Sequence, residues 1–301
     1  MNRSAWSLKA AFEQAGCDPL NPDEVVWAAQ IACILEASAD KPGNVTRHRD
    51  FADLKFEDFL ISAVAIGPAL RAAKGSSVGE SILRAIRDTQ RFVACNTNLG
   101  IILLFVPLVK AYGPGDLRER LSEVLASLTV EDARKAYEAI RLAKPGGMGR
   151  VERYDVAQEE VDITLREAMW LARDRDSIAR EYVTDYEITF ELGCPSLRRC
   201  WEQSQNLMDS IVQASLIILA QVPDSLIGRK NGPAAAEEVS RRAKEVLERG
   251  GIFSEAGREA LRYFDLYLRE HHLNPGTTAD LTASSIFVAL LEGGLYAMFS
   301  V

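Results

Sequence analysis

Apolar residues recur at helical spacing along almost the whole chain. The segment that opens at Asn21-Pro22-Asp23 has a broad apolar face, and Pro22 suits a first helical turn, where a backbone N–H is not needed. This helix is predicted to end near Lys41-Pro42-Gly43, because a proline disfavours helical geometry in the residue before it. The same spacing predicts further helices over 56–73, 79–94, 99–112, 116–127, 130–143, 156–171, 175–191, 197–221, 234–249, 255–272 and 277–298.

The helix pattern predicts the fold class. The segment from Leu99 to Tyr112 is apolar on every side, which is typical of a helix in the middle of a core. Residues 182–190 are the only segment that suggests a strand, and their charged residues suit a helix equally well. Since there is no fixed repeat or low-complexity linker, we expect one compact all-α, multi-helix domain over residues 1–301. The glycine-rich segment 144–149 is predicted to be a mobile loop.

Composition and charge exclude several classes of protein. Of the 301 residues, 48% are hydrophobic and 26% charged, which is ordinary for a globular protein. The net charge of −8 argues against a nucleic-acid partner. No segment is apolar for long enough to predict a signal peptide or a membrane span, and the five cysteines include no C-x-x-C pair. We therefore expect a reduced, cytoplasmic protein without a zinc site.

The first polar cluster surrounds a glycine turn. Lys41, Asn44 and Arg47 place two cations and an amide around Gly43, an arrangement that suits a phosphate chain. Glu36, on the helix just before the turn, adds a carboxylate that can bind a metal ion. The alternative is a helix C-cap with Gly43 in the left-handed conformation, and the residues alone leave both interpretations open.

Two further clusters lie at predicted helix N-termini. Asn96, Thr97 and Asn98 precede the apolar helix, and a cap needs only one of them, so the surplus donors favour an anion or ribose site. Thr277 or Thr278 is a good N-cap, which places Asp280 in the first turn of the last helix. A carboxylate there is ordinarily part of a capping box, which is the alternative to a functional role.

The remaining clusters have ordinary structural explanations as well. Asp176 and Arg180 stand four residues apart, as in a solvated helical salt bridge. Asp224, Arg229 and Lys230 lie in a segment that resembles a turn. Phosphate-loop, dinucleotide-binding and HExxH motifs are absent from the sequence. Many carboxylates close to phosphate-type donors favour Mg²⁺.

Four blocks, in this order, carry a resemblance to a known family. They are ILEASADKPGNVTRHRD, CNTNLGIILLFVPL, PDSLIGRKNG and NPGTTADLTASSIFVALL. Together they resemble the triphosphoribosyl-dephospho-CoA synthase family, over residues 25–298. The resemblance implies an all-helical transferase that moves triphosphoribose from ATP to the 2′-hydroxyl of dephospho-CoA and releases adenine, in a reaction similar to glycosyl transfer with Mg²⁺ anchoring the triphosphate.

The resemblance also implies roles for residues. Phosphate contacts are assigned to Lys41, Gly43, Asn44, Arg47, Arg229 and Lys230. Metal binding or general-base catalysis is assigned to Glu36, Asp50 and Asp280. Ribose or phosphate contacts are assigned to Asn96, Thr97, Asn98 and Asp224, with Asp176 and Arg180 as weaker candidates.

One difference from the family pattern leaves the acceptor open. Synthases that act on dephospho-CoA typically read N-T-H-K-G, whereas Asn98 and Leu99 replace the histidine and lysine here. A related acceptor, or a ribosyl-phosphate or nucleotide enzyme of another cofactor pathway such as that of pterin-type one-carbon carriers, is one alternative. Others are a nucleotide N-glycosidase or phosphohydrolase, or a nucleotide-binding helical scaffold without turnover. Apolar helix faces could form a homodimer, although no heptad pattern specifies one.

Overall fold

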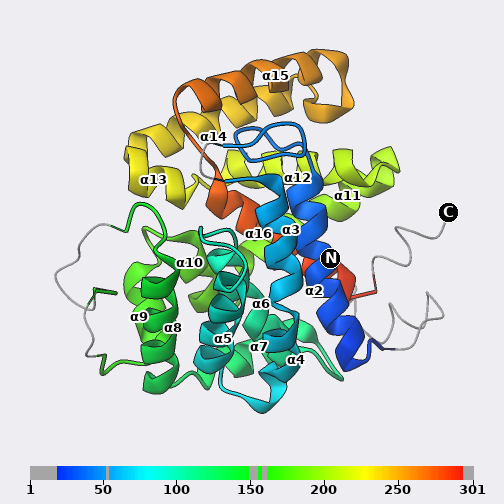
Figure 1. Cartoon of the computed structure of the whole chain (residues 1–301). Coiled ribbons are helices and arrows are strands. Elements are labelled where there is room, and N and C mark those ends of the chain that lie inside the picture. Colours follow the sequence, from blue (N-terminus) through cyan, green and yellow to red (C-terminus); the bar gives the residue numbers. More distant parts are fainter. Residues whose placement is uncertain (1–18, 52–53, 149–154, 158–160, 294–301) are drawn as a thin grey trace.

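Helices account for nearly all regular structure in this protein (Figure 1). The computed structural model describes residues 19–51, 54–148, 155–157 and 161–293. Its α-helices are α2 (Pro22–Ser38), α3 (Phe56–Ala65), α4 (Gly67–Ala72), α5 (Val78–Gln90), α6 (Leu99–Ala111), α7 (Leu117–Ala126), α8 (Val130–Ala143), α9 (Leu165–Ala172), α10 (Ser177–Val183), α11 (Cys194–Ser204), α12 (Leu207–Gln221), α13 (Ser225–Asn231), α14 (Pro233–Glu248), α15 (Glu255–Glu270) and α16 (Gly276–Leu291). Within those ranges no strand forms, which confirms the all-α prediction.

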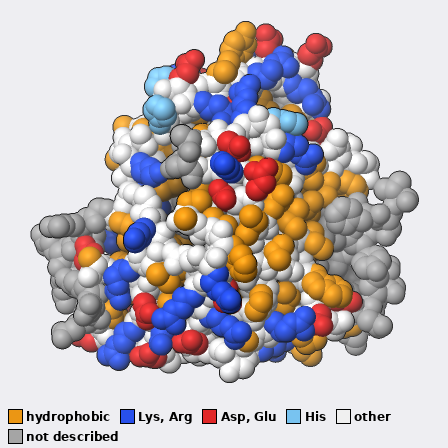
Figure 2. All heavy atoms as spheres, in the orientation of Figure 1, with side chains coloured by type: hydrophobic (Ala, Val, Ile, Leu, Met, Phe, Trp, Pro, Cys, Tyr) orange, Lys and Arg blue, Asp and Glu red, His pale blue; other side chains and the backbone are white. Residues whose placement is uncertain are grey.

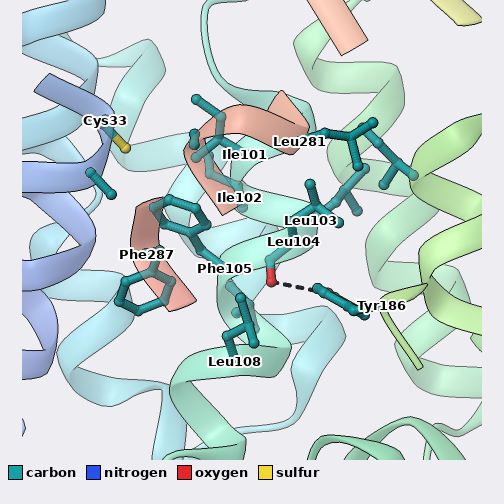
Figure 3. Close-up of a cluster of buried hydrophobic side chains, with 14 of the residues drawn as sticks. Cys33, Ile101, Ile102, Leu103, Leu104, Phe105, Leu108, Tyr186, Leu281 and Phe287 are labelled. Atoms are coloured by element: carbon teal, nitrogen blue, oxygen red, sulfur yellow. Dashed lines mark hydrogen bonds between the residues drawn. The ribbon is translucent and has the colours of Figure 1, made fainter. Parts of the chain in front are cut away.

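One hydrophobic core joins the helices into a single compact unit, as predicted. In Figure 1, α4 to α10 form one group and α11 to α15 another, with α2 and α16 between them. α16 packs against α2, α6, α11 and α12 and is buried along most of its length. Where it crosses α6, the rings of Phe105 and Phe287 lie 4.5 Å apart between centroids (Figure 3). Two apolar helices therefore meet at the centre of the core.

A proline inside α6 is compensated by tyrosines from the neighbouring segment. Pro107 has no N–H, so the carbonyl oxygen of Leu103, four residues earlier, lacks its usual helical donor. The hydroxyl of Tyr182 donates to that oxygen at 2.7 Å. Tyr186 donates to the carbonyl of Leu104 at 3.0 Å (Figure 3). Both tyrosines are buried. Their hydroxyl groups satisfy backbone acceptors of α6 and connect this helix to α10 and the segment that follows it.

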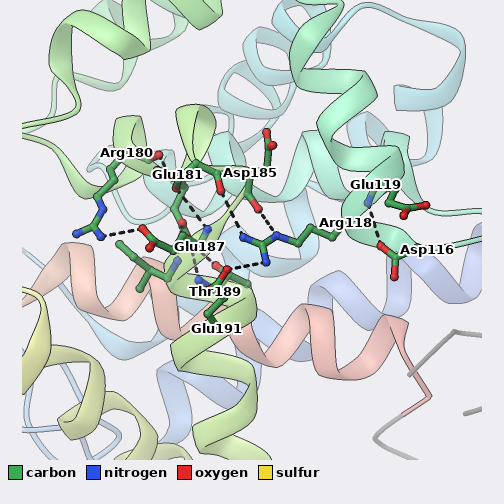
Figure 4. Close-up of polar contacts among 11 residues, drawn as sticks. Asp116, Arg118, Glu119, Arg180, Glu181, Asp185, Glu187, Thr189 and Glu191 are labelled. Carbon is green, nitrogen blue, oxygen red and sulfur yellow. Dashed lines mark hydrogen bonds and ion pairs between the residues drawn. The ribbon is translucent and has the colours of Figure 1, made fainter. Parts of the chain in front are cut away.

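The helix predicted over 175–191 is broken. Asp185 and Tyr186 have left-handed φ angles of 51° and 57°, and a π-helix over Ile188–Gly193 follows them. The buried carboxylate of Glu181 accepts the N–H groups of Ile188 and Thr189, at 3.0 and 2.7 Å (Figure 4). This side chain holds the start of the second segment, which helical spacing alone does not reveal.

Other predicted boundaries also change for local reasons. The helix over 56–73 divides at Ile66, where Pro68 interrupts the backbone hydrogen bonding, and that over 197–221 divides at Gln205, whose φ is 51°. The helix predicted from residue 156 begins only at Leu165, because Thr164 and Glu167 form a capping box. Residues 158–160, and 294–298 of the last predicted helix, lie outside the described residues.

Two predicted non-helical segments have different outcomes. The segment with Asp224, Arg229 and Lys230 forms helix α13 rather than a turn, because Asp224 caps it by accepting backbone N–H groups. Residues 144–148 form a non-helical turn after α8, while Gly149 lies outside the described residues.

In the described part of the chain, no single helix has the length and apolarity needed to cross a membrane; α12 and α13 reach those limits only as a pair bent by 55°.

Candidate functional site

A cavity of about 710 Å³ opens among helices α2, α6, α8, α9, α10, α13 and α16. Its apolar lining residues include Tyr137, Ile140 and Met169. Its polar lining residues include Glu36, Asn44, Asn96, Thr97, Asn98, Lys144, Asp155, Arg175, Asp176, Arg229, Lys230, Asn274, Thr277 and Asp280. Members of all five polar clusters identified in the sequence, far apart along the chain, therefore meet around one cavity.

Asp280 lies directly over the N-terminus of α6. A Cβ atom on Gly100 would fall 2.1 Å from Oδ2 of Asp280, so only glycine leaves room for this carboxylate. Asp280 makes no hydrogen bond or ion pair with any described residue. Burial, together with the negative charges of Glu36, Asp224 and Asp176, raises its pKa well above the usual range. The arrangement leaves an unpartnered carboxyl group at the cavity wall, available to a proton or a cation.

Asp280 is not a capping residue, contrary to the structural alternative. The N-cap of α16 is Pro275, and the two predicted caps have other partners. Thr277 accepts a hydrogen bond from Ser225 at 3.0 Å, and Thr278 donates to Asp224. The helix begins one residue earlier than predicted, so Asp280 lies past its first turn.

Lys41 is buried beside Glu36 and does not line the cavity. Its Nζ lies 2.9 Å from Oε1 of Glu36, and it also donates to the carbonyl oxygens of Glu36 and Ala39. The side chain is 1% exposed. Lys41 therefore makes its hydrogen bonds inside the protein, holding Glu36 in place at the cavity wall and closing the turn after α2.

The glycine turn is fixed against the connection between α15 and α16. Gly43 has φ of 73°, and a Cβ there would lie 2.8 Å from Leu268. Its N–H donates to Asp265 at 2.9 Å. Asn44, which lines the cavity, donates to Asn274 at 2.9 Å. The helix C-cap is Ala39 rather than Gly43, so the capping alternative is wrong.

Three more of the predicted residues lie outside the cavity lining. Arg47 and Asp50 are exposed, and Asp50 accepts the backbone N–H of Phe56 at the start of α3. Asp224 is buried and accepts both the N–H and the hydroxyl of Thr278, at 2.7 and 2.8 Å, besides capping α13. It joins α13 to α16 and so fixes Arg229 relative to Asp280.

The polar residues before α6 all line the cavity. Asn96 accepts the N–H of Leu99 at 3.1 Å, and Thr97 shares a hydrogen bond with Ser62 at 2.5 Å. Asn98 occupies the N-cap position without a capping bond and instead donates to Thr89 at 3.4 Å. The capping alternative thus accounts for Asn96, whereas the amide of Asn98 keeps hydrogen-bonding capacity for a ligand.

The salt bridge expected between Asp176 and Arg180 is wrong. Asp176 is the N-cap of α10, and its other oxygen pairs with Arg229 at 2.6 Å. Arg180 instead pairs with Glu187 at 2.8 Å, away from the cavity (Figure 4). Because a cap stands before the first helical turn, its side chain faces the backbone rather than the residue four positions later.

Comparison with known proteins decides the family. The model of the family described as CitG, ATP:dephospho-CoA triphosphoribosyl transferase, matches residues 22–297. The chain belongs to this family of transferases. Relatives include the 2-(5''-triphosphoribosyl)-3'-dephosphocoenzyme-A synthase of Klebsiella pneumoniae, 26% identical over 92% of this chain and 93% of that protein. A probable synthase of Malonomonas rubra is 23% identical over 90% and 89%.

A solved structure shares the fold of this transferase. It comes from Archaeoglobus fulgidus and is described, provisionally, as a triphosphoribosyl-dephospho-CoA synthase. It is 31% identical, covers 78% of this chain and 99% of its own, and superposes with a TM-score of 0.61. The resemblance inferred over residues 25–298 is therefore confirmed, and with it the assignment of the chain as an enzyme of the transferase class.

Sequence reasoning missed two cations of the transferase cavity. Lys144 follows α8, and Arg175 lies between α9 and α10. Both stand in irregular segments, where periodicity carries no information about direction. Among the described residues no group of three acidic, cysteine or histidine side chains is close enough to hold a metal ion, so Glu36, Asp50 and Asp280 do not form a common site.

Proposed function

We propose that this cavity transfers triphosphoribose from ATP to the 2′-hydroxyl of dephospho-CoA, or of a related acceptor, with Mg²⁺. The acceptor oxygen forms a bond to C1′ of the ATP ribose, the bond from C1′ to adenine breaks, and adenine leaves with a proton. The observation that carries the proposal is the unpartnered Asp280 carboxyl over the N-terminus of α6. Family membership supports the substrates.

Asp280 suits the role of general base. Burial and neighbouring carboxylates raise its pKa, which makes the carboxylate a stronger proton acceptor than an exposed aspartate. It would accept the proton of the attacking hydroxyl. Asn98, with its amide at the same helix end, would hold the ribose by hydrogen bonds.

The donor set fits Mg²⁺ as a partner of the substrate rather than as an ion held by protein alone. Glu36 and Asp280 are the members of the predicted carboxylate set that line the cavity, and Mg²⁺ accepts one or two carboxylates together with phosphate oxygens and water. Glu36, fixed by Lys41, would hold the ion with Asp280 nearby. When bound, Mg²⁺ supplies positive charge to the triphosphate.

Incubation with ATP and Mg²⁺, with and without dephospho-CoA, tests the proposal by chromatography of free adenine. We expect adenine and triphosphoribosyl-dephospho-CoA only when the acceptor is present. Adenine without an acceptor would support a nucleotide N-glycosidase, and ATP binding without adenine would support a scaffold or an acceptor such as a pterin precursor. The Asp280→Asn variant should lose turnover while its circular dichroism spectrum stays unchanged. Retained turnover would exclude Asp280 as the general base.

The expected homodimer has one visible candidate surface. Hydrophobic side chains gather on the face over α2 and α3 (Figure 2). They include Trp27, Ile31 and Ile34 of α2, and Ile61 and Val64 of α3, with Val64 63% exposed. Light scattering of wild type and Trp27→Glu tests this surface: a dimer that the substitution dissociates supports it, and a wild-type monomer contradicts it.

A further inference from the structure

Four cations lie along the cavity wall formed by α13 and the loops next to it. Lys144 follows α8, Arg175 precedes α10, and Arg229 and Lys230 belong to α13. We call this set the cationic rim. Contacts link its members: Arg229 pairs with Asp176, the residue after Arg175, at 2.6 Å. The rim therefore joins three segments that are far apart in sequence.

The other end of the rim is fixed by glycines. A Cβ atom on Gly146 would lie 2.4 Å from Cε of Lys230, and one on Gly147 would lie 3.0 Å from Cγ of the same lysine. The stem of Lys230 thus lies on the glycine turn, two residues beyond Lys144. A larger residue at Gly146 would displace the lysine, so the glycines leave room for Lys230 beside the turn that follows Lys144.

The described residues neutralise the positive charge of the rim only at Arg229, which pairs with Asp176. The side chains of Lys144 and Lys230 make no hydrogen bond or ion pair with any described residue. Arg175 donates only to the carbonyl of Leu171, at 3.4 Å. Arg229 has one carboxylate partner, Asp176, while its Nε is buried without an acceptor. A buried donor left unpaired is unfavourable, and a ligand oxygen would satisfy it.

The loop after α2 does not compete for the same ligand. Lys41 is neutralised by Glu36, and the N–H of Gly43 is taken by Asp265. Arg47 lies outside the cavity lining. Among the described residues, the cavity-lining cations without a carboxylate partner are therefore Lys144, Arg175 and Lys230 of the rim. Arg229 also acts on Asp280 electrostatically, which places the rim next to the proposed general base.

We infer that the cationic rim binds the triphosphate of the nucleotide substrate, with Lys144 and Arg175 as binding residues in addition to Arg229 and Lys230. The inference rests on the proposed function and makes it more specific. Three of the four cations have no carboxylate partner among the described residues, so the rim suits a polyanion such as a triphosphate, and charge-assisted contacts of this kind are the strong ones. The ribose attached to the triphosphate then lies toward Asp280.

Calorimetric titration with inorganic tripolyphosphate tests the rim without requiring turnover. Lys144→Ala, Arg175→Ala and Lys230→Ala should each weaken binding about tenfold, and the triple variant by at least about 100-fold. Lys244→Ala, an exposed lysine of α14 outside the cavity, is the matched control and should bind as wild type does. Circular dichroism and thermal unfolding verify that each variant is folded. An unchanged dissociation constant in the folded triple variant overturns the inference.

Steady-state kinetics test the binding function of the cationic rim separately from the proposed reaction. We expect the single variants to raise the KM for ATP while the KM for dephospho-CoA changes less than about twofold. A rise confined to dephospho-CoA would assign the rim to the acceptor's pyrophosphate and contradict the inference. If wild type releases no adenine but binds tripolyphosphate through these residues, the inference stands and the proposed reaction fails. Turnover with an unchanged KM for ATP in the triple variant would support the reaction and overturn the inference.

Discussion

Gly100→Ala is the sharpest test of the site, because the added methyl group displaces the Asp280 carboxylate, together with the end of the Ile178 side chain, without changing the chemistry of either. The added Cβ would lie 2.1 Å from Oδ2 of Asp280, whereas ordinary contact begins at 3.4 Å. Asp280 must therefore move by about 1.3 Å, the difference between these distances. A shift of about 1 Å in a reacting group costs about 100-fold in rate, or about 2.7 kcal/mol of barrier. We expect adenine release to fall by that factor.

The same substitution should leave the fold in place. Alanine gains up to about 1 kcal/mol over glycine in a helix, which offsets part of an overpacking cost of about 1–3 kcal/mol. Urea unfolding should therefore detect a change of at most about 2 kcal/mol. Gly75→Ala, which has no neighbour within 4 Å, is the control. A Gly100→Ala enzyme with wild-type adenine release would refute the placement of Asp280 at the reacting centre.

Three further predictions follow from the buried charges and the metal. Lys41→Met should lower the free energy of unfolding, measured by urea titration, by about 3–5 kcal/mol, because Glu36 is left as an unpaired buried charge. The double variant Lys41→Met with Glu36→Gln should recover much of this loss. No recovery would contradict the pairing of Lys41 with Glu36. Burial raises the pKa of Glu181 to about 7. Between the usual pKa near 4.5 and about 7, only the unfolded chain releases this proton, so the free energy of unfolding should fall by about 1.4 kcal/mol per pH unit as the pH rises. Glu181→Gln should lack that slope. Parallel slopes for wild type and variant would refute the raised pKa of Glu181. Chelation by EDTA should stop adenine release and added Mg²⁺ should restore it, whereas release that persists in EDTA excludes the metal.

The sequence predicts the helices well where local signals are strong. The apolar helix after Asn98 begins and ends within one residue of its prediction, because a polar break precedes it and Gly113-Pro114-Gly115 follows. The break at Asp185 could not be predicted, since it depends on Glu181, whose buried carboxylate accepts N–H groups beyond the break. A side-chain contact to backbone groups seven and eight residues ahead leaves no periodic pattern in the sequence.

The candidate site, like the fold, could be predicted from the sequence only in part. Asp280, Asn98 and Arg229 meet at the cavity as the clusters suggested. The error at Lys41 has a physical cause: a lysine beside a glycine turn has the same appearance in sequence whether it faces solvent or a buried glutamate. Arg175 was missed because its position depends on how two helices meet rather than on either helix.

The hydroxyl of Tyr182 donating to Leu103 also has an evolutionary consequence. The bond is needed because Pro107 leaves that carbonyl without a donor, so the proline and the tyrosine form one unit of selection. A lineage that loses the proline frees the tyrosine to become phenylalanine. One that changes the tyrosine first passes through an intermediate with an unsatisfied oxygen in its centre. We therefore expect homologues that lack the tyrosine to lack the proline as well, whereas homologues that lack only the proline can keep the tyrosine.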